Sequence, residues 1–393
     1  PLGDPDGPDR RRTALLGRWI MTLPAVGRQA SVDLLRAVAI VLMVVVHFVE
    51  NLSGWWGDAG GTFAGVHRVW WLPTGFAAPI FTFLSGMSYR LWLAVRQERQ
   101  RSEESIAKGT VRRGLFLIGL GFAFNVLIWL PQDVFNWDIL TLIGFGLLAL
   151  EAARRMPDWV VLFAAVLVAA VSPAMRAAAG YADFWQAGYF DYEFNIAEVG
   201  LGWLVTGYFP VFPWLAYPLA GYGLAPWLFT HHRTGLLTAV VLGATATFLV
   251  VAWPGLPAVI TGNAARAWTM FPASTAYLLG TLATVLAALA VLHPLLDPQP
   301  TSAAGRWLMA WAEPFSRHAL SIYLLHHAVH IWPLWAWGLA TTGEPDSLWQ
   351  EAMPVAWSLG LAAVFLLATL VLLRRLDRRR LPTAESLMRW LCD

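Results

Sequence analysis

The chain has 393 residues, of which 58% are hydrophobic and 13% are charged. Soluble domains carry about 25% charged residues, so this composition excludes a soluble protein and indicates an integral membrane protein. The net charge of +2 predicts no nucleic acid or other acidic partner, and the single cysteine, Cys392, excludes an intramolecular disulfide and a cysteine-based metal site.

The N-terminal segment, residues 1–30, is predicted to lie in the cytoplasm or at the membrane surface. Arg10, Arg11 and Arg12 precede a short apolar stretch, which superficially suggests a signal peptide. That stretch, from Leu15 to Met21, is short and contains tryptophan, and no small-residue cleavage site follows before Asp33. A segment that leads into the first spanning helix is therefore expected.

Ten hydrophobic runs follow, most of them near the length of about 20 residues that a spanning helix needs. Four prolines in the sixth run predict a kinked or broken helix packed inside the bundle, where neighbouring helices can satisfy the freed backbone groups. The runs lie at about Val32–Val49, Trp70–Val95, Gly114–Leu130, Ile139–Ala152, Trp159–Met175, Phe209–Phe229, Leu236–Trp253, Ala276–Leu292, Phe315–Leu339 and Val355–Leu373.

Basic residues test this count through their preference for the cytoplasmic side. With ten spans and a cytoplasmic N-terminus, 22 basic residues fall inside, three fall outside, and Arg36 and Arg90 lie within spans. The sequence thus predicts an all-α polytopic bundle with both termini in the cytoplasm, and eleven spans are the main alternative. The membrane domain covers residues 31–376, and residues 377–393 form a cytoplasmic tail.

The first span carries an ionisable face. Asp33, Arg36 and His47 fall within about 60° of each other on a helix, and Arg36 and His47 lie about 16 Å apart along its axis. Ionisable residues inside spans are functional by default, so this face predicts a polar passage with a histidine near its outer end. The alternative is a local ion pair between Asp33 and Arg36 near the headgroups, with His47 as an interfacial residue.

The same stretch carries a resemblance. "SVDLLRAVAIVLMVVVH" and "GFAAPIFTFLSGMSYRLWL" resemble the opening of the heparan-α-glucosaminide N-acetyltransferase-like membrane family, which belongs with the wider transmembrane acyltransferases. An Arg and a His separated by ten residues is also similar to the acyltransferase-3 pattern. Three later segments also resemble the family, in the expected order, at Tyr208–Leu224, Phe271–Ala283 and Phe315–His327.

The resemblance implies an acyl-CoA-dependent acetyltransferase of the inner membrane. It implies that an acyl group, commonly acetyl, passes from cytoplasmic acyl-CoA to a hydroxyl or amine, usually on an extracytoplasmic sugar or glycoconjugate. Arg36 and the inner arginines would hold the donor, with Asp33 orienting Arg36. Membrane lipid surrounds such a protein, and the sequence leaves open whether it is a homodimer.

Two histidines compete for the chemistry. His67 lies in the outer loop before the second run and is the positional match of the histidine regarded as catalytic in this family, although the loop length differs. That branch often has Asn where this chain has His47. Either imidazole could act as a general base or as a transient acyl carrier. His67 could equally be an ordinary loop residue.

His326, His327 and His330 cluster in the ninth run. His326 and His330 share a helix face, which geometrically permits metal or haem ligation, but neither Cys nor an acidic residue accompanies them in sequence. We therefore expect no metal. His326 matches the family's YLxH element, which implies a polar residue that orients substrate or a catalytic partner.

Arginines surround the predicted cytoplasmic ends of the second and third spans. The planar guanidinium suits phosphate, so Arg112 and Arg113, with Arg90 or Arg96, are predicted to hold the phosphates of CoA. The cytoplasmic preference of basic residues explains the same arginines without a ligand. Gly221 and Gly223 are explained by the packing of small residues between helices rather than by a phosphate loop.

Other functions stay open on the residues alone. The outer loop is acidic and aromatic around Trp185, which fits either a carbohydrate-facing surface or an aromatic interface belt. A transporter could use the same ionisable face, but the proline-rich sixth run has no counterpart in the other half. A haem-bearing electron carrier would need paired histidines on facing helices.

Overall fold

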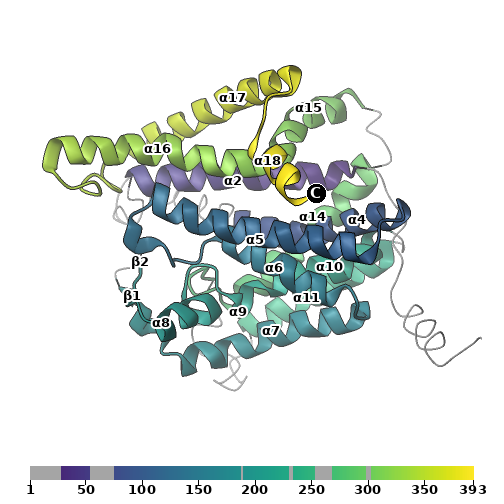
Figure 1. The fold of residues 1–393 in the computed structure, drawn as a ribbon. Helices are drawn as coiled ribbons and strands as arrows, with labels where there is room; N and C mark the ends of the chain where they lie inside the picture. The colour runs from purple at the N-terminus through teal and green to yellow at the C-terminus, as the bar shows by residue number, and fades with distance from the viewer. Residues whose placement is uncertain (1–27, 54–74, 187–188, 230–232, 253–267, 298–301) are drawn as a thin grey trace, which may run out of the picture. The chain divides into compact units, whose positions relative to one another are not determined.

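The computed structural model describes residues 28–53, 75–186, 189–229, 233–252, 268–297 and 302–393 (Figure 1). The secondary-structure elements of these residues are all helical, apart from two strands of two residues each, β1 (Trp185–Gln186) and β2 (Tyr189–Phe190), which pair antiparallel. The predicted all-α class is confirmed. The described residues pack as two compact units, of which the first takes in residues 82–118 and 139–290 and the second residues 29–81, 119–138 and 291–393.

The first unit is built from helices that follow the predicted second to eighth runs. Three of them, α4, α5 and α14, begin or end in the second unit. The helices are α4 (Ala77–Glu98), α5 (Glu103–Ile128), α6 (Ile139–Ala153), α7 (Asp158–Ala178), α8 (Ile196–Leu201), α9 (Val211–Trp214), α10 (Ala216–Phe229), α11 (Arg233–Ala252) and α14 (Thr275–Leu296), with short helical turns η2 (Tyr181–Phe184) and η3 (Gly202–Thr206).

Backbone contact between α4 and α10 depends on two glycines. A Cβ on Gly221 would stand 2.0 Å from the carbonyl oxygen of Phe83, and one on Gly86 would stand 1.9 Å from the carbonyl oxygen of Pro218. Only residues without a side chain allow helices to approach so closely. The packing interpretation of Gly221 is therefore confirmed, and the sixth run is part of a tightly packed helix pair.

The sixth run is broken, as its prolines predict. The chain passes through η3, the short α9 and then α10, with Pro210 before α9 and Phe212 in a non-helical conformation. The largest side chains buried here, Trp214, Tyr217 and Tyr222, are each at most 1% exposed. The broken segment thus lies inside its unit rather than at its surface.

The second unit surrounds α2 (Ala30–Ser53), the helix that carries the ionisable face. α15 (Ala303–Arg317), α16 (Ala319–Thr342) and α17 (Val355–Arg379) all contact it, and Figure 1 shows α16 running alongside α2. The short turn η1 (Pro131–Asp133) follows α5, and α18 (Ala384–Cys392) ends the chain beside α16.

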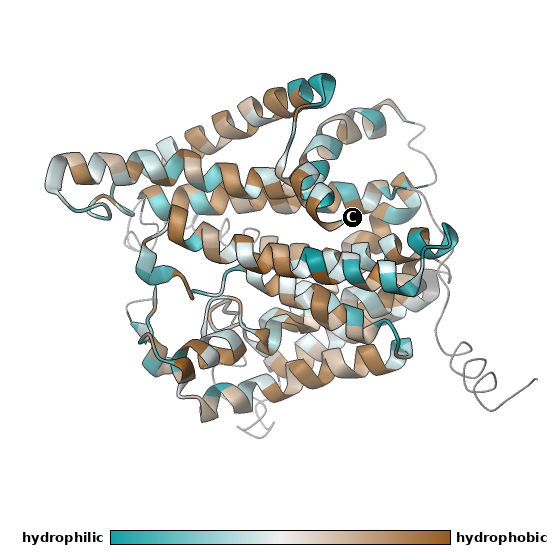
Figure 2. Ribbon diagram, viewed as in Figure 1, coloured by the Kyte–Doolittle hydropathy of each residue, from teal (hydrophilic) through white to brown (hydrophobic). Residues whose placement is uncertain are grey.

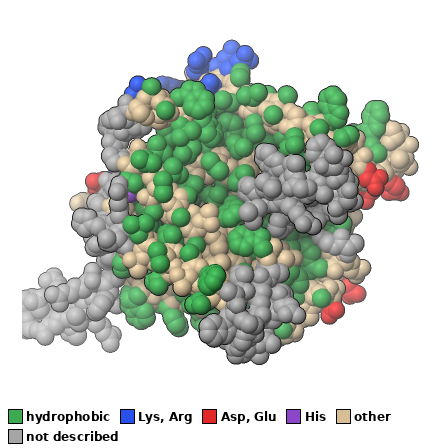
Figure 3. All heavy atoms as spheres, turned by 180° about the vertical axis from the view of Figure 1, so that it is seen from behind, with side chains coloured by type: hydrophobic (Ala, Val, Ile, Leu, Met, Phe, Trp, Pro, Cys, Tyr) green, Lys and Arg blue, Asp and Glu red, His purple; other side chains and the backbone are tan. Residues whose placement is uncertain are grey.

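Length and apolar composition identify the described helices that could cross a membrane. Six described helical segments are long and apolar enough to cross a membrane, and α6 and the main part of α11 are shorter apolar helices. Figure 2 shows α17 apolar along most of its length and hydrophilic at its C-terminal end, and in Figure 3 hydrophobic side chains cover much of the face shown. Along α17, Trp357, Leu361, Val364 and Leu367 are exposed at helical spacing. The chain is a multi-pass membrane protein, whereas the count of ten spans and the side of each terminus stay predictions.

The predicted ninth run is divided near its start between two helices. A single apolar run was predicted over about Phe315–Leu339, but α15 ends at Arg317 and α16 begins at Ala319. His318 between them has φ −112° and ψ 31°, outside the helical range. Pro314, which cannot continue the hydrogen-bond ladder, stands in the last turn of α15. His318 therefore lies at the polar end of α16, outside its apolar stretch.

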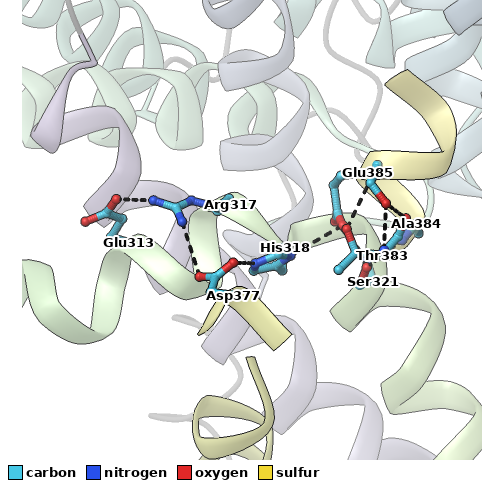
Figure 4. A network of polar contacts seen from close by, with 9 residues as sticks. Glu313, Arg317, His318, Ser321, Asp377, Thr383, Ala384 and Glu385 are labelled. Atoms are coloured by element: carbon cyan, nitrogen blue, oxygen red, sulfur yellow. Dashed lines mark hydrogen bonds and ion pairs between the residues drawn. The ribbon is translucent and has the colours of Figure 1, made fainter. Parts of the chain in front are cut away.

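Hydrogen bonds and ion pairs connect α18 to the junction between α15 and α16 (Figure 4). The Ser321 backbone N–H and hydroxyl donate to the two oxygens of Glu385, at 2.8 and 2.7 Å. His318 Nε2 lies 2.9 Å from an Asp377 oxygen, and its Nδ1 lies 3.6 Å from Glu385. An imidazole with a carboxylate at each nitrogen is favoured in its charged form. These contacts join α16, α17 and α18. The residues that make them are called the C-terminal latch below: His318, Ser321, Asp377 and Glu385.

The latch predicts a pH window for docking of α18. The Glu385 carboxylate raises the pKa of His318, against burial, and Asp377 adds to the rise. Burial alone would raise the pKa of Glu385, but the contacts with His318 and Ser321 outweigh it and lower that pKa to about 2. The His318 contribution is complete below its ordinary pKa and is lost as pH rises through the raised one. The Glu385 contribution is complete above its ordinary pKa of 4.5 and is lost as pH falls towards 2.

We expect hydrogen exchange of the α18 amides to be slowest between about pH 4.5 and 6.5, after correction for intrinsic rates. A His318→Gln variant should lose the slowing on the alkaline side of this window. Exchange of α18 that does not depend on pH between 5 and 9 in both proteins would contradict the latch.

Candidate functional site

The N-terminal end of the α2 face is organised by a serine from α15. Ser316 Oγ donates to Asp33 Oδ1 at 2.6 Å and accepts from Arg36 Nη1 at 2.8 Å. Asp33 and Arg36 also form the local ion pair at 3.7 Å. Asp33 and Ser316 are buried and Arg36 is half-buried. The ion pair that the sequence offered as an alternative is present, and Ser316 holds its geometry.

The C-terminal part of the same face carries a histidine pair. His47 on α2 is half-buried, and its Nδ1 lies 2.9 Å from Nε2 of His326 on α16. The two rings are stacked, with centroids 5.2 Å apart. The structure therefore brings together two of the predicted site residues that are far apart in sequence.

Hydrogen bonds assign the tautomers of this pair. Nδ1 of His326 lies 3.0 Å from the carbonyl oxygen of Ile322, and a carbonyl can only accept. In neutral His326, Nδ1 therefore carries the proton and Nε2 accepts from the Nδ1–H of His47. Neutral His47 then has its lone pair on Nε2. This leaves His47 with an oriented, unprotonated nitrogen.

A second chain of hydrogen bonds runs beside the pair. Nδ1 of His330 donates to the carbonyl oxygen of His326, so its Nε2 accepts from the side-chain amide of Asn51 at 2.9 Å. The Asn51 oxygen in turn accepts from Trp349 Nε1 at 3.3 Å. Asn51 is four residues after His47, on the same face of α2. Its polar side chain extends the predicted ionisable face by one turn.

His327 stands in an aromatic environment. Its ring contacts Phe124, Trp129 and Tyr323, with centroids 5.1, 5.4 and 5.8 Å away. The side chain is 3% exposed, and its Nδ1 is buried without a hydrogen-bond partner. Tyr323 donates to the buried carboxylate of Asp138 at 2.9 Å. His47, Asn51, His326, His327 and His330 together are called the histidine cluster below.

The predicted phosphate-binding arginines lie in the first unit. Arg96 and Arg113 both lie over the ring of Trp92, with guanidinium carbons 5.1 and 4.9 Å from its centroid. Such cation–π contacts fix the direction of a guanidinium while leaving its edge N–H groups able to donate. Arg112, next to Arg113, is exposed. These three arginines and Trp92 form a basic cluster where α4 ends and α5 begins.

Arg90 differs from its neighbours. It is 4% exposed, pairs with Asp158 of α7 at 3.0 Å, donates to the Tyr222 hydroxyl and lies 4.5 Å from the Tyr222 ring centre. A buried guanidinium with a buried carboxylate partner holds helices together. The contacts of Arg90 therefore favour a structural role over the predicted phosphate role.

Two further predictions concern the loops that the sequence predicts on the outer side. His67 lies outside the described residues, so its catalytic role stays a prediction. In the loop after α7, Trp185 stacks on Tyr181 and on Phe271, with centroids 5.7 and 5.5 Å apart, and donates its N–H to the Thr206 carbonyl at 2.8 Å. These aromatic rings pack against one another, which favours packing over an open carbohydrate platform.

Sequence reasoning missed Ser316, Asn51 and the pair of Tyr323 with Asp138. Asn51 could have been found, because it continues the spacing of Asp33, Arg36 and His47 on one face of the helix. Ser316 had no such signal, since a serine at a helix end is ordinary. Asp138 lies in a connection between helices, and its burial becomes apparent only when Tyr323 contacts it.

Comparison with known proteins agrees with the resemblance in the opening helices. Residues 28–255, more than half of the chain, match the family described as heparan-alpha-glucosaminide N-acetyltransferase, catalytic. No curated protein matches the chain significantly. The matched part contains the ionisable face of α2 and the basic cluster, while His326, His327 and His330 follow it. This multi-pass membrane chain belongs to the heparan-alpha-glucosaminide N-acetyltransferase catalytic family and is an acetyltransferase.

Proposed function

We propose that the protein takes an acetyl group from acetyl-CoA on the cytoplasmic side of the inner membrane and transfers it to an amine or hydroxyl of an extracytoplasmic sugar or glycoconjugate. The observation that carries the proposal is the His47–His326 pair, which leaves Nε2 of His47 as an oriented base. The acetyl-CoA donor is supported by the family. The sugar acceptor is supported by the family's description alone.

The basic cluster is the proposed donor site. CoA carries phosphates, and guanidinium groups donate paired hydrogen bonds to phosphate oxygens. Trp92 holds Arg96 and Arg113 in place, which reduces the side-chain entropy lost on binding. Arg112 supplies a third, exposed charge. Arg36, held by Ser316 and Asp33, is the proposed polar contact for the donor within the membrane.

In the proposed reaction, Nε2 of His47 removes a proton from the acceptor amine or hydroxyl as that group attacks the acetyl carbonyl carbon. The new bond joins the acceptor to the acetyl group, and the carbon–sulfur bond of the thioester breaks. CoA leaves as the thiolate and takes up the proton that His47 held, which gives free CoA thiol and neutral His47. His326 is a positioning residue, because it acts through its hydrogen bond with His47.

An acyl-histidine route uses the same lone pair as a nucleophile. His67 is the other candidate for either role and is included in the test. Rapid mixing with radiolabelled acetyl-CoA alone separates the two routes. Direct transfer leaves the protein unlabelled without acceptor, whereas the acyl-histidine route labels it at one histidine.

The overall activity is tested with the full chain, purified in detergent. Purified protein should bind acetyl-CoA and release free thiol when glucosamine or another amino sugar is added, and should release little without acceptor. Thiol release should fall to background in His47→Ala or in His67→Ala, depending on which histidine is the base. Absence of binding to any CoA ester would overturn the proposal, and near-normal turnover in both variants would overturn the assigned chemistry.

Arg113→Ala is expected to raise the KM for acetyl-CoA about tenfold or more with a smaller change in kcat. One charge-assisted hydrogen bond contributes about 1.5–3 kcal/mol, and the phosphates lie far from the reacting carbonyl. Arg374→Ala, which removes an exposed arginine near the end of α17, is the matched control. An unchanged KM in Arg113→Ala and in Arg112→Ala would remove the basic cluster from the donor site.

A further inference from the structure

The histidine cluster has a geometry that the acetyl-transfer chemistry does not require. His47, His326 and His327 each present a ring nitrogen, and the three nitrogens all lie within 4.8 Å of one another. The ring centres of His326 and His327 are 4.0 Å apart, and those of His47 and His327 are 4.6 Å apart. We propose that these three side chains form a binding site for one divalent transition-metal ion, with zinc as the fitting ion.

Ligand chemistry supports zinc. Three neutral imidazoles with an open fourth position form a known zinc arrangement, with metal–nitrogen distances of about 2.0–2.1 Å. Tetrahedral angles at those distances place the nitrogens about 3.3 Å apart. The His47 and His326 nitrogens stand 2.9 Å apart, and a ring nitrogen of His327 lies within 4.8 Å of both, so the three are close to the spacing that zinc needs. A hydroxide or other anion at the fourth position lowers the charge to be buried.

The surrounding hydrogen bonds support the same ligands. Metal-bound histidines usually donate their other ring N–H to a carbonyl or carboxylate, which fixes the tautomer. His326 does so through the Ile322 carbonyl, which leaves Nε2 for the ion. His327 offers an independent observation, because its Nδ1 is buried without a partner in a side chain that is 3% exposed. A buried ring nitrogen that lacks a hydrogen-bond partner is costly unless something binds it.

Metal and base chemistry compete for the same nitrogens. An ion on Nδ1 of His47 moves the proton of that neutral imidazole to Nε2, the atom that the proposed function uses as the base. Zinc should therefore inhibit acetyl transfer, and a chelator should restore it. This consequence rests on the proposed function, whereas metal binding itself does not.

Binding is measured on the full chain, with any affinity tag removed, by equilibrium dialysis against Zn²⁺ and elemental analysis. We expect one zinc ion per chain in the unmodified protein and in His330→Gln, which alters a neighbouring histidine outside the trio. His327→Gln should lose the ion, and so should His326→Gln. His293→Gln, at a half-exposed histidine elsewhere, controls for adventitious binding.

Cobalt gives a second readout that does not depend on activity. The Co²⁺-loaded protein should show the intense visible bands of tetrahedral coordination, lost in His327→Gln and kept in His330→Gln. A melting temperature measured for each variant identifies any that fail to fold, and His47→Gln then replaces His327→Gln. Failure of the unmodified protein to take up zinc, or equal uptake by all three trio variants, would overturn the site.

Failure of the metal site and failure of the proposed function give different results. Acetyl transfer by a protein that takes up no zinc would refute the metal site and leave the proposed function intact. A stoichiometric zinc protein that is more active than the metal-free form would keep the site and overturn His47 as the base.

Discussion

His47→Ala should lower kcat for acetyl transfer by about 10²–10⁴, the usual contribution of a positioned general base, while acetyl-CoA binding stays within about threefold of normal. The expectation follows from the tautomer chain, in which Ile322 fixes His326 and His326 fixes His47. The measurement is thiol release at saturating donor and acceptor, with a separate binding titration for acetyl-CoA. Added imidazole should partly restore turnover in the alanine variant.

The role of His326 is tested by comparing two replacements. In His326→Gln the amide oxygen can still accept from Nδ1–H of His47, whereas in His326→Leu nothing can. The glutamine variant should therefore keep more activity than the leucine variant, with the difference in kcat rather than in KM. Ser53→Ala, farther along α2, is the control for disturbing the same helix. Full activity in His47→Ala and in His326→Leu would show that the pair is structural.

Asp158→Ala should destabilise the protein by about 3–5 kcal/mol, because it leaves the Arg90 guanidinium buried without its carboxylate. Both side chains of this ion pair are at most 6% exposed, and they join α4 to α7. The Tyr222 hydroxyl beside Arg90 cannot replace the lost charge. The result should appear as a lowered melting temperature in detergent and a lower yield of monodisperse protein.

Two further variants separate this effect from a general loss of charge. Glu104→Ala breaks the exposed Glu104–Lys108 pair and should change stability by at most about 1 kcal/mol. The double variant Arg90→Met with Asp158→Leu replaces both charges with apolar side chains and should recover much of the stability that Asp158→Ala loses. A melting temperature unchanged in Asp158→Ala would show that this ion pair does not stabilise the fold, and would favour the phosphate role predicted for Arg90 from sequence.

Local patterns in the sequence determined the membrane class and the helices. Each of the ten apolar runs corresponds to helical structure among the described residues, because about 20 apolar residues in lipid can satisfy their backbone only as a helix. Proline content predicted the broken sixth segment for the same backbone reason. Helical spacing also placed Asp33, Arg36 and His47 on one face, and the ion pair between the first two follows from their i, i+3 spacing.

Only the tertiary structure decided what that face meets. Periodicity tells which residues share a helix face, but it cannot tell which other face packs against it. Ser316 on α15 and His326 on α16 lie about 280 positions away from α2 along the chain. Ser316 donates to Asp33, and His326 orients His47 through a hydrogen bond. The expectation of no metal rested on the lack of Cys or acidic neighbours in sequence. In the proposed zinc site, His326 and His327 of α16 are joined by His47 from α2, which is distant in sequence. Arg90 shows the same limit, because its sequence neighbours suggested phosphate while its spatial neighbour is the buried Asp158.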